Sequence, residues 1–316
     1  MPFSLRRFAL VPALASALAL SAAAAQLGGA AQSVMPSSTI QVISIDYHRL
    51  ASDPLAEQLE KQVLPTQVQG LEALLTRGGV QPASDLNRLT FATFQSKKGI
   101  GLIGIAEGNL SDLNFSKFYQ KTAKQPNPPQ IDGVDVYDSS GLAFFMADPA
   151  TLIFGSRAAI EQAIATQQGG TNIGQNEALA DLIAGTQTSD VWSVVDAQGS
   201  RTMVGSLIAG STGPIDPSMI DQHFNGARYT IAFQNQVQVN LELMTTDALS
   251  AAAVSTGMNA AIALRSHQEK NPEAKAILNE VQVDSAGNNA FLQVSTPESS
   301  LATLMKTDLL QSILKH

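Results

Sequence analysis

The stretch VQVNLEL, residues 237–243, alternates apolar and polar side chains without a break. Successive side chains of a β-strand point to opposite faces of a sheet, so one face of this strand is apolar and the other is polar. Strands of a doubly wound parallel sheet are buried on both faces and lack this alternation. The stretch therefore predicts an α+β fold, in which a mostly antiparallel sheet carries helices on one face and meets water on the other.

The same order of elements occurs twice along the chain. A strand near residues 40–46 precedes a helical pattern with Pro65 as an expected kink, and LNRLTFATFQ and GIGLIGIAEG then predict a hairpin. SDVWSVVD and ARYTIAFQNQVQVNLEL repeat this order in the second half. After the first hairpin we expect a helix from Ser111 or Asp112 to about residue 121, strands near 134–137, 142–147 and 151–154, and a helix to about residue 166. After the second hairpin we expect a helix, the two strands EVQVDS and NAFLQVS, and a last helix over 297–314. We interpret this as a duplication of strand-helix-hairpin-helix units over 39–189 and 190–316, with ferredoxin-like local order.

The first 25 residues have the organisation of a secretory signal peptide. Arg6 and Arg7 precede the apolar run 8–20, and small residues follow at Ala23 and Ala25. We expect cleavage near Ala25, with an uncleaved anchor as the alternative. Residues 26–38 are small and polar, which predicts a flexible tether. The predicted location is the periplasm or the extracellular space.

Composition narrows the possible partners. The chain has no cysteine, so neither a lipidated N-terminal cysteine nor a disulfide is possible. Its net charge is −8, and removal of the signal peptide leaves 17 basic and 27 acidic residues, a net of −10. An acidic surface disfavours nucleic acids and anionic membrane surfaces. No later stretch has the length and apolarity of a membrane span. An envelope protein or a small ligand remains as a partner, and the oligomeric state is left open.

Gly155-Ser156-Arg157 is a candidate anion site, because a small-residue turn and an arginine open a predicted helix there. Backbone amides at a helix start can hold a phosphate or a carboxylate. The alternative is that Ser156 caps the helix by accepting a hydrogen bond from the amide of Ala158 or Ala159, while Gly155 eases the turn. The spacing of a phosphate loop is absent, which favours the cap.

Asp46, His48 and Asp196 are the candidate catalytic residues. Asp46 and Asp196 end equivalent strands, and His48 shares a face with Asp46 if the chain is extended there. The alternative is that each aspartate caps the next helix and that His48 is a surface residue. The four histidines are scattered, so we expect no metal site and no cofactor. Trp192, the single tryptophan, lies in an apolar strand, where core packing is the default.

Several stretches together resemble a broad set of uncharacterised exported bacterial proteins. They are SIDYHRL, GVQPASDLNRLTF, IDGVDVY and TLIFGSRAAIEQAI, which fall within residues 39–196. In that set a hairpin precedes a small-residue turn and a helix. The resemblance implies an α+β fold and supplies no catalytic residues.

Two functions remain open. The first is an exported, non-enzymatic binding or scaffold protein that uses the wet sheet face or a cleft between the duplicated units. The second is a periplasmic hydrolase built on the strand-end carboxylates and His48. No nucleophile, metal or cofactor signature is present, which favours the first and leaves catalysis undecided.

Overall fold

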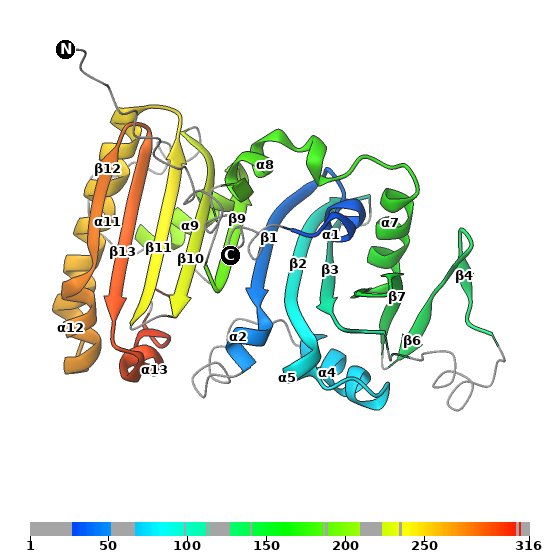
Figure 1. Ribbon diagram of the computed structural model, residues 1–316. Helices are drawn as coiled ribbons and strands as arrows, with labels where there is room; N and C mark the ends of the chain where they lie inside the picture. Colours follow the sequence, from blue (N-terminus) through cyan, green and yellow to red (C-terminus); the bar gives the residue numbers. More distant parts are fainter. Residues whose placement is uncertain are drawn as a thin grey trace, which may run out of the picture.

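The computed structural model describes residues 27–51, 67–97, 99–111, 113, 127–139, 141–184, 186, 189–208, 223–233, 236–307 and 310. Eleven of the described strands form one sheet, in the order β12-β13-β11-β10-β9-β1-β2-β3-β8-β7-β6 (Figure 1). Every neighbouring pair in this sheet is antiparallel. The chain is therefore an α+β protein, as the alternating stretch predicts.

The first half of the chain forms one side of the sheet. Its strands are β1 (Thr39–Asp46), β2 (Leu86–Ser96), β3 (Gly99–Gly108), β6 (Tyr137–Ser139), β7 (Leu142–Asp148) and β8 (Thr151–Gly155), and β4 (Gln130–Ile131) and β5 (Val134–Asp135) form a separate ribbon. Its helices are α1 (Gly29–Val34), α2 (Tyr47–Ala51), α4 (Gln67–Arg77), α5 (Pro82–Asp85), α7 (Arg157–Gln167), the short 3-10 turn η1 (Ile173–Gln175) and α8 (Glu177–Ala184).

The second half forms the other side. Its strands are β9 (Val191–Asp196), β10 (Phe224–Phe233), β11 (Val237–Thr245), β12 (Gln282–Ala286) and β13 (Asn289–Thr296). Its helices are α9 (Ala197–Ile208), α11 (Ala248–Gln268), α12 (Pro272–Glu280), η2 (Glu298–Ser300) and α13 (Leu301–Leu304). No helix in the described part of the chain has both the length and the apolarity needed to cross a membrane.

The strand order repeats outward from the centre of the sheet. From β1 it runs β2, β3, β8 and β7, and from β9 it runs β10, β11, β13 and β12. In each half a strand, a hairpin and a second pair of strands follow one another in sequence, and the later strand of the second pair lies beside the hairpin. This order agrees with the predicted duplication. A ferredoxin-like sheet contains a split β-α-β unit, which requires two neighbouring parallel strands. This sheet has none among its described strands, so it is not ferredoxin-like.

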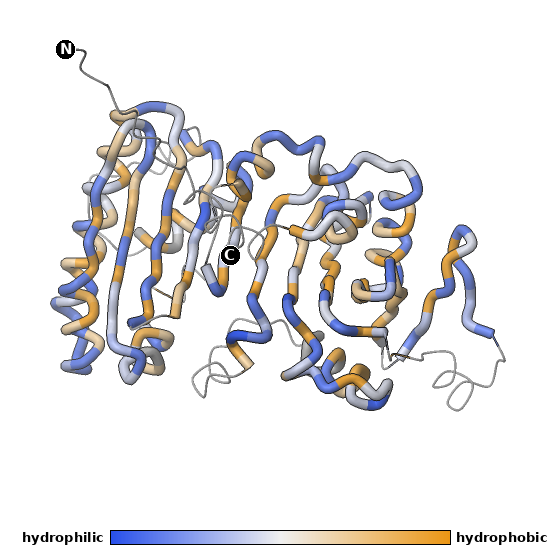
Figure 2. Tube along the Cα trace, in the orientation of Figure 1, coloured by the Kyte–Doolittle hydropathy of each residue, from blue (hydrophilic) through white to orange (hydrophobic). Residues whose placement is uncertain are grey.

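The two faces of the sheet differ, and we name them by their residues. The inner face is the one that carries Ile45, Val191 and Leu241, and it holds the larger core cluster. α4, α9 and α11 bury apolar side chains in this cluster. In Figure 1 α9 lies behind β10 and β11, and α11 and α12 lie behind and beside β12. The opposite, outer face of the second half is polar, and the colours alternate along β10 and β11 in Figure 2. In the second half the described helices therefore lie on one face of the sheet, as predicted.

The first half carries helices on both faces. Ile160 and Ile164 of α7 share a second core cluster with Ile103 and Ile105 of β3, on the outer face. Leu179 and Leu182 of α8 belong to the same cluster. These strands are therefore buried on both sides, which explains why GIGLIGIAEG is apolar along most of its length rather than alternating.

The prediction of a flexible tether over 26–38 is wrong for the residues that the structure describes. Leu27, Ala31, Val34 and Met35 are all at most 5% exposed and belong to the second core cluster. The first three follow one another at spacings of four and three residues, which places them on one side of a helical turn. Residues 29–34 thus form α1 and help to close the outer face of the first half.

The two halves meet through β1 and β9. Gln41 pairs with Val195 and Ile45 with Val191, so the sheet is continuous across the repeat. Asp190, 3% exposed, lies just before β9 and binds Arg49 at 2.7 Å. Its other oxygen accepts from the Phe233 amide at 2.6 Å. Burial raises the pKa of Asp190, and the Phe233 amide and Arg49 oppose that shift. This buried carboxylate joins α2, β9 and β10 at the centre of the sheet.

Several predictions fall wholly or partly outside the described residues. The kink at Pro65 lies outside them, and so does most of the helix predicted from Ser111 or Asp112 to Lys121. The helix predicted over 297–314 begins as a 3-10 turn and continues as α13 in its described part. The unit boundary between 189 and 190 remains a prediction.

Candidate functional site

A set of six side chains on the outer face of β10, β11 and β13 lines an open cavity of about 330 Å³. We call this set the polar array; it consists of Arg228, Thr230, Asn240, Glu242, Phe291 and Gln293. The antiparallel register places them in two rows that cross the strands, Arg228-Glu242-Phe291 and Thr230-Asn240-Gln293. In Figure 1 no helix of the described part of the chain covers these three strands on the side that faces the viewer.

The charges within the polar array neutralise one another. Arg228 Nε donates to Glu242 Oε2 at 2.6 Å, and the two side chains are 24% and 14% exposed. Asn289 Nδ2 donates to the other carboxylate oxygen of Glu242 at 2.8 Å. Both oxygens of Glu242 are thus bound, and the array offers a compensated ion pair rather than a free charge.

The second row keeps unused hydrogen-bonding capacity. Asn240 Nδ2 donates to Thr230 Oγ1 over a long 3.4 Å, which leaves the amide oxygen and one N–H of Asn240 available. The side chain of Gln293 is exposed and makes no hydrogen bond to any other described residue. Amide groups that both donate and accept therefore stand beside the compensated pair.

The first half has a similar pair of charges in its own hairpin. Arg88 Nη1 lies 3.7 Å from Glu107 Oε2, and the two residues are cross-strand partners. Here the outer face is covered: a Cβ atom on Gly28, at the start of α1, would lie 2.2 Å from Glu107 Oε1. Glu107 Oε2 is buried without a hydrogen-bond partner in the described structure. Burial raises the pKa of Glu107, Arg88 lowers it and Asp148 raises it further.

The structure places Gly155, Ser156 and Arg157 at the start of α7. Ser156 is the N-cap and accepts from the Ala159 amide at 3.3 Å. Arg157 binds Asp138 at 2.7 Å, so its charge is already met by an acid. Gly155 is the last residue of β8, and a Cβ there would lie 2.8 Å from the Leu102 carbonyl oxygen. Glycine is thus required by close approach to β3 rather than by the turn.

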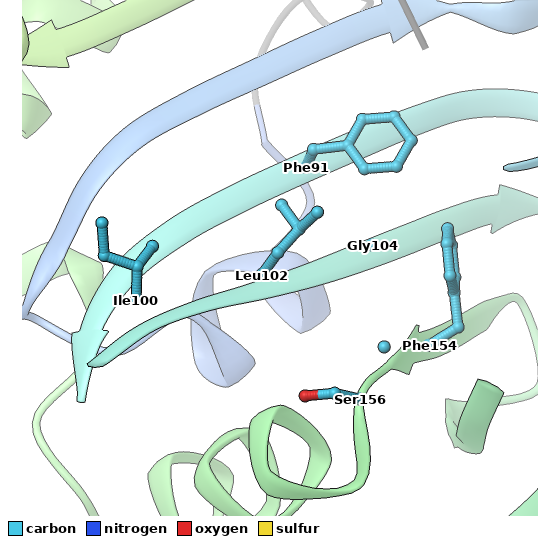
Figure 3. A pocket seen from close by; sticks show the side chains of 7 residues that line it. Phe91, Ile100, Leu102, Gly104, Phe154 and Ser156 are labelled. Atoms are coloured by element: carbon cyan, nitrogen blue, oxygen red, sulfur yellow. The ribbon is translucent and has the colours of Figure 1, made fainter. Parts of the chain in front are cut away.

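Ser156 also lies at the edge of an apolar cavity of about 210 Å³ (Figure 3). Figure 3 shows Phe91 and Phe154 at one end of this cavity, Ile100 at the other, and Leu102 between Ile100 and the two rings. Ile100 is 69% exposed. The two rings meet edge to face with centroids 6.1 Å apart. The described lining residues carry no charge. Such walls do not suit an anion, and nothing in the described residues shows what covers them.

Asp46, His48 and Asp196 are not brought together. Asp46 Oδ1 accepts from the Arg49 amide at 3.0 Å, and Asp196 Oδ1 accepts from the Gly199 amide at 2.8 Å, so each caps the start of the following helix. His48 is exposed within α2, so the chain is not extended between it and Asp46. Asp196 follows Val195, the partner of Gln41, whereas Asp46 stands at the far end of β1. The antiparallel joint therefore separates the two carboxylates by roughly 20 Å.

No group of three His, Asp or Glu side chains that could hold a metal ion occurs among the described residues. Trp192 is 2% exposed and packs in the core, as predicted. The residues that sequence reasoning does not single out are those of the polar array. The alternation in β11 marks Asn240 and Glu242 as outward-facing, but their neighbours on β10 and β13 depend on the strand register.

No protein-family model matches this chain, and no curated protein matches it. The fold defines it as an α+β protein built on one antiparallel sheet. Among solved structures it is similar to crystal form III of TP0453, with a TM-score of 0.51 and 10% sequence identity over 87% of this chain and 98% of that chain. Crystal form I of TP0453 gives a TM-score of 0.49 at 10% identity, over 88% and 97% of the two chains. The likeness to form III shows a shared fold.

Proposed function

We propose that this chain is an exported, non-enzymatic binding or scaffold protein whose ligand site is the polar array. One observation carries the proposal: among the described residues no helix covers the polar outer face of the second half, whereas α1, α7 and α8 cover the same face of the first half. A cavity of about 330 Å³ lies at the low end of the range for ligand sites, which is roughly 300–1,000 Å³. The use of Asp46 and Asp196 as helix caps also favours binding over hydrolysis.

The absence of cysteine makes this proposal directly testable. Gln293→Cys introduces the only thiol of the chain in the middle of the polar array, and it accepts a benzophenone maleimide. The matched control is Gln162→Cys, an exposed glutamine on α7 over the other half of the sheet. Each labelled chain, beginning at Gln26, is mixed with a whole envelope extract and irradiated, and the adducts are identified by mass spectrometry.

We expect a discrete adduct from position 293 that is absent at position 162. Equal labelling at both positions, or no adduct at 293, would contradict a binding role for the polar array. The export part of the proposal is checked separately, since protein recovered from the envelope or the medium should begin at or near Gln26. An intact Met1 form in the cytoplasm contradicts it.

A further inference from the structure

We propose that the polar array binds a neutral oligosaccharide chain. This inference rests on the proposed function, because it names the ligand class for the same site. The site offers side chains only: the backbone groups of β10, β11 and β13 face their neighbouring strands in the sheet. An extended peptide recognised through its backbone would therefore find its partners at a sheet edge, not on this face.

The free groups match hydroxyls. A sugar hydroxyl donates one hydrogen bond and accepts others, and a planar amide presents a donor and an acceptor side by side. Asn240 retains both after its contact with Thr230, and Gln293 retains its full capacity among the described residues. Gln282, the cross-strand partner of Gln293 on β12, is exposed and extends the same row of amides. Three hydrogen-bonding side chains thus follow one line across the strands, with Thr230 at its end.

The charged row argues for a neutral ligand. Both oxygens of Glu242 are bound, by Arg228 and Asn289, and the charges of Glu242 and Arg228 neutralise each other, so the pair has no net charge with which to attract an ion. Asp284, the cross-strand partner of Phe291, adds a negative charge beside the array. The whole chain is also acidic, with a net charge of −8. Anionic polymers are repelled by this surface, and uncharged polyols are not.

Phe291 supplies the apolar part of the site. Its side chain is half-buried on the outer face, between Glu242 and Asp284 in the cross-strand row. An aromatic ring that is apolar on its face and lies next to hydrogen-bonding groups suits a ligand with both C–H and O–H surfaces. A sugar ring is such a ligand. Because the array spans three strands about 4.8 Å apart and is open, it fits a stretch of a chain better than an enclosed single unit.

The test uses an array of neutral and anionic oligosaccharides and titration calorimetry of the best neutral binder, with the chain from Gln26 to His316. We expect binding to neutral glycans, weakened about 2–10-fold by Gln293→Ala and by Asn240→Ala, since each removes hydrogen bonds of ordinary strength. Phe291→Leu should weaken binding by a similar factor because it removes the ring face. Gln162→Ala is the matched control and should bind like the wild type. Circular dichroism checks that each variant is folded, and Gln293→Ala disrupts no hydrogen bond with another described residue.

The outcomes separate this inference from the proposed function. No binding to any neutral glycan, combined with a protein or other adduct from position 293, overturns the ligand class and leaves the binding role standing. Preference for anionic over neutral glycans also overturns it. Glycan binding that survives Gln293→Ala and Asn240→Ala places the site elsewhere and contradicts the polar array. No adduct at 293 and no glycan binding overturn both proposals.

Discussion

Glu107 is a largely buried carboxylate whose loss of water is only partly compensated by its neighbours. Its Oε2 lies 3.7 Å from Arg88 and accepts no hydrogen bond from any described residue, and Asp148 adds a second negative charge nearby. Its counterpart in the other hairpin, Glu242, has both oxygens bound. The contrast shows what α1 does: it covers the outer face of the first half with apolar residues, and the carboxylate beneath it loses water.

Because the pKa of Glu107 is raised, the free energy of unfolding should depend on pH. A carboxyl with a folded pKa above its unfolded value holds its proton more tightly in the folded state, so stability is lost as pH rises through these values. We therefore expect Glu107→Gln to be at least as stable as the wild type at pH 7, and the difference to vanish near pH 4. Thermal unfolding followed at several pH values measures this. Glu161→Gln, an exposed change on α7, is the control; a Glu107→Gln chain less stable than wild type at pH 7 contradicts the argument.

Among the elements, helix starts account for most of the sequence-predicted site residues. Asp46, Ser156 and Asp196 each accept from a backbone amide three residues later. Asp247 does the same for α11. Hydrogen bonds from the backbone amide and the hydroxyl of Ser250 lower the pKa of Asp247 to about 2. Aspartate and serine can serve in acid–base chemistry or anion binding. In these four positions they instead accept hydrogen bonds from the amides that the first turn of a helix leaves unpaired.

Ser156 and Arg157 should therefore differ in their effects on stability. Ser156→Ala removes a cap and should cost about 0.5–2 kcal/mol. Arg157→Ala removes an exposed ion pair with Asp138 and should cost about 0–1 kcal/mol. Urea unfolding measures both, and Ser156→Asp, which restores an acceptor, is the control. Millimolar phosphate should leave the melting temperature unchanged; a stabilisation that Arg157→Ala abolishes would make the turn an anion site instead.

Elements with a strong pattern could be predicted, and those that depend on partners could not. The alternation from Val237 to Leu243 predicted β11 and its polar side, and the hairpins followed from the same logic. α1 was missed because its six residues, GAAQSV, are too few to form a stable helix alone and become helical only when packed against the sheet. The polar array was missed because Phe291 and Gln293 come together with Asn240 only through the register of β11 and β13.

At the scale of the whole molecule, the two halves of the chain share one sheet and one core. Ile45 and Leu89 from the first half and Val191 and Leu241 from the second belong to the same buried cluster. The sheet passes from one half to the other through paired strands rather than through a linker. Neither half has an interface that could open without breaking the sheet.

One thermal transition should follow from this continuity. We expect calorimetry of the chain from Gln26 to give a single peak, because unfolding either half removes the partner strand and part of the core of the other. Asp190→Ala, which removes the buried carboxylate at the joint, should lower the melting temperature and leave the transition single. The substitution should lower the free energy of unfolding by about 1–3 kcal/mol, because the buried Phe233 amide loses its hydrogen-bond acceptor. Two resolved peaks would show that the halves are independent domains.

The pairing of β1 with β9 also governs what happens to an incomplete chain. TIQVISID is β-branched and apolar, and one of its two long edges is occupied only by residues that come much later, from Val191 onward. A polypeptide released or cleaved before that point presents a bare strand edge of the kind that recruits other chains. Premature termination before Val191 should therefore yield self-associating material rather than a smaller stable protein, and a growing chain exposes this edge of β1 until β9 has been made.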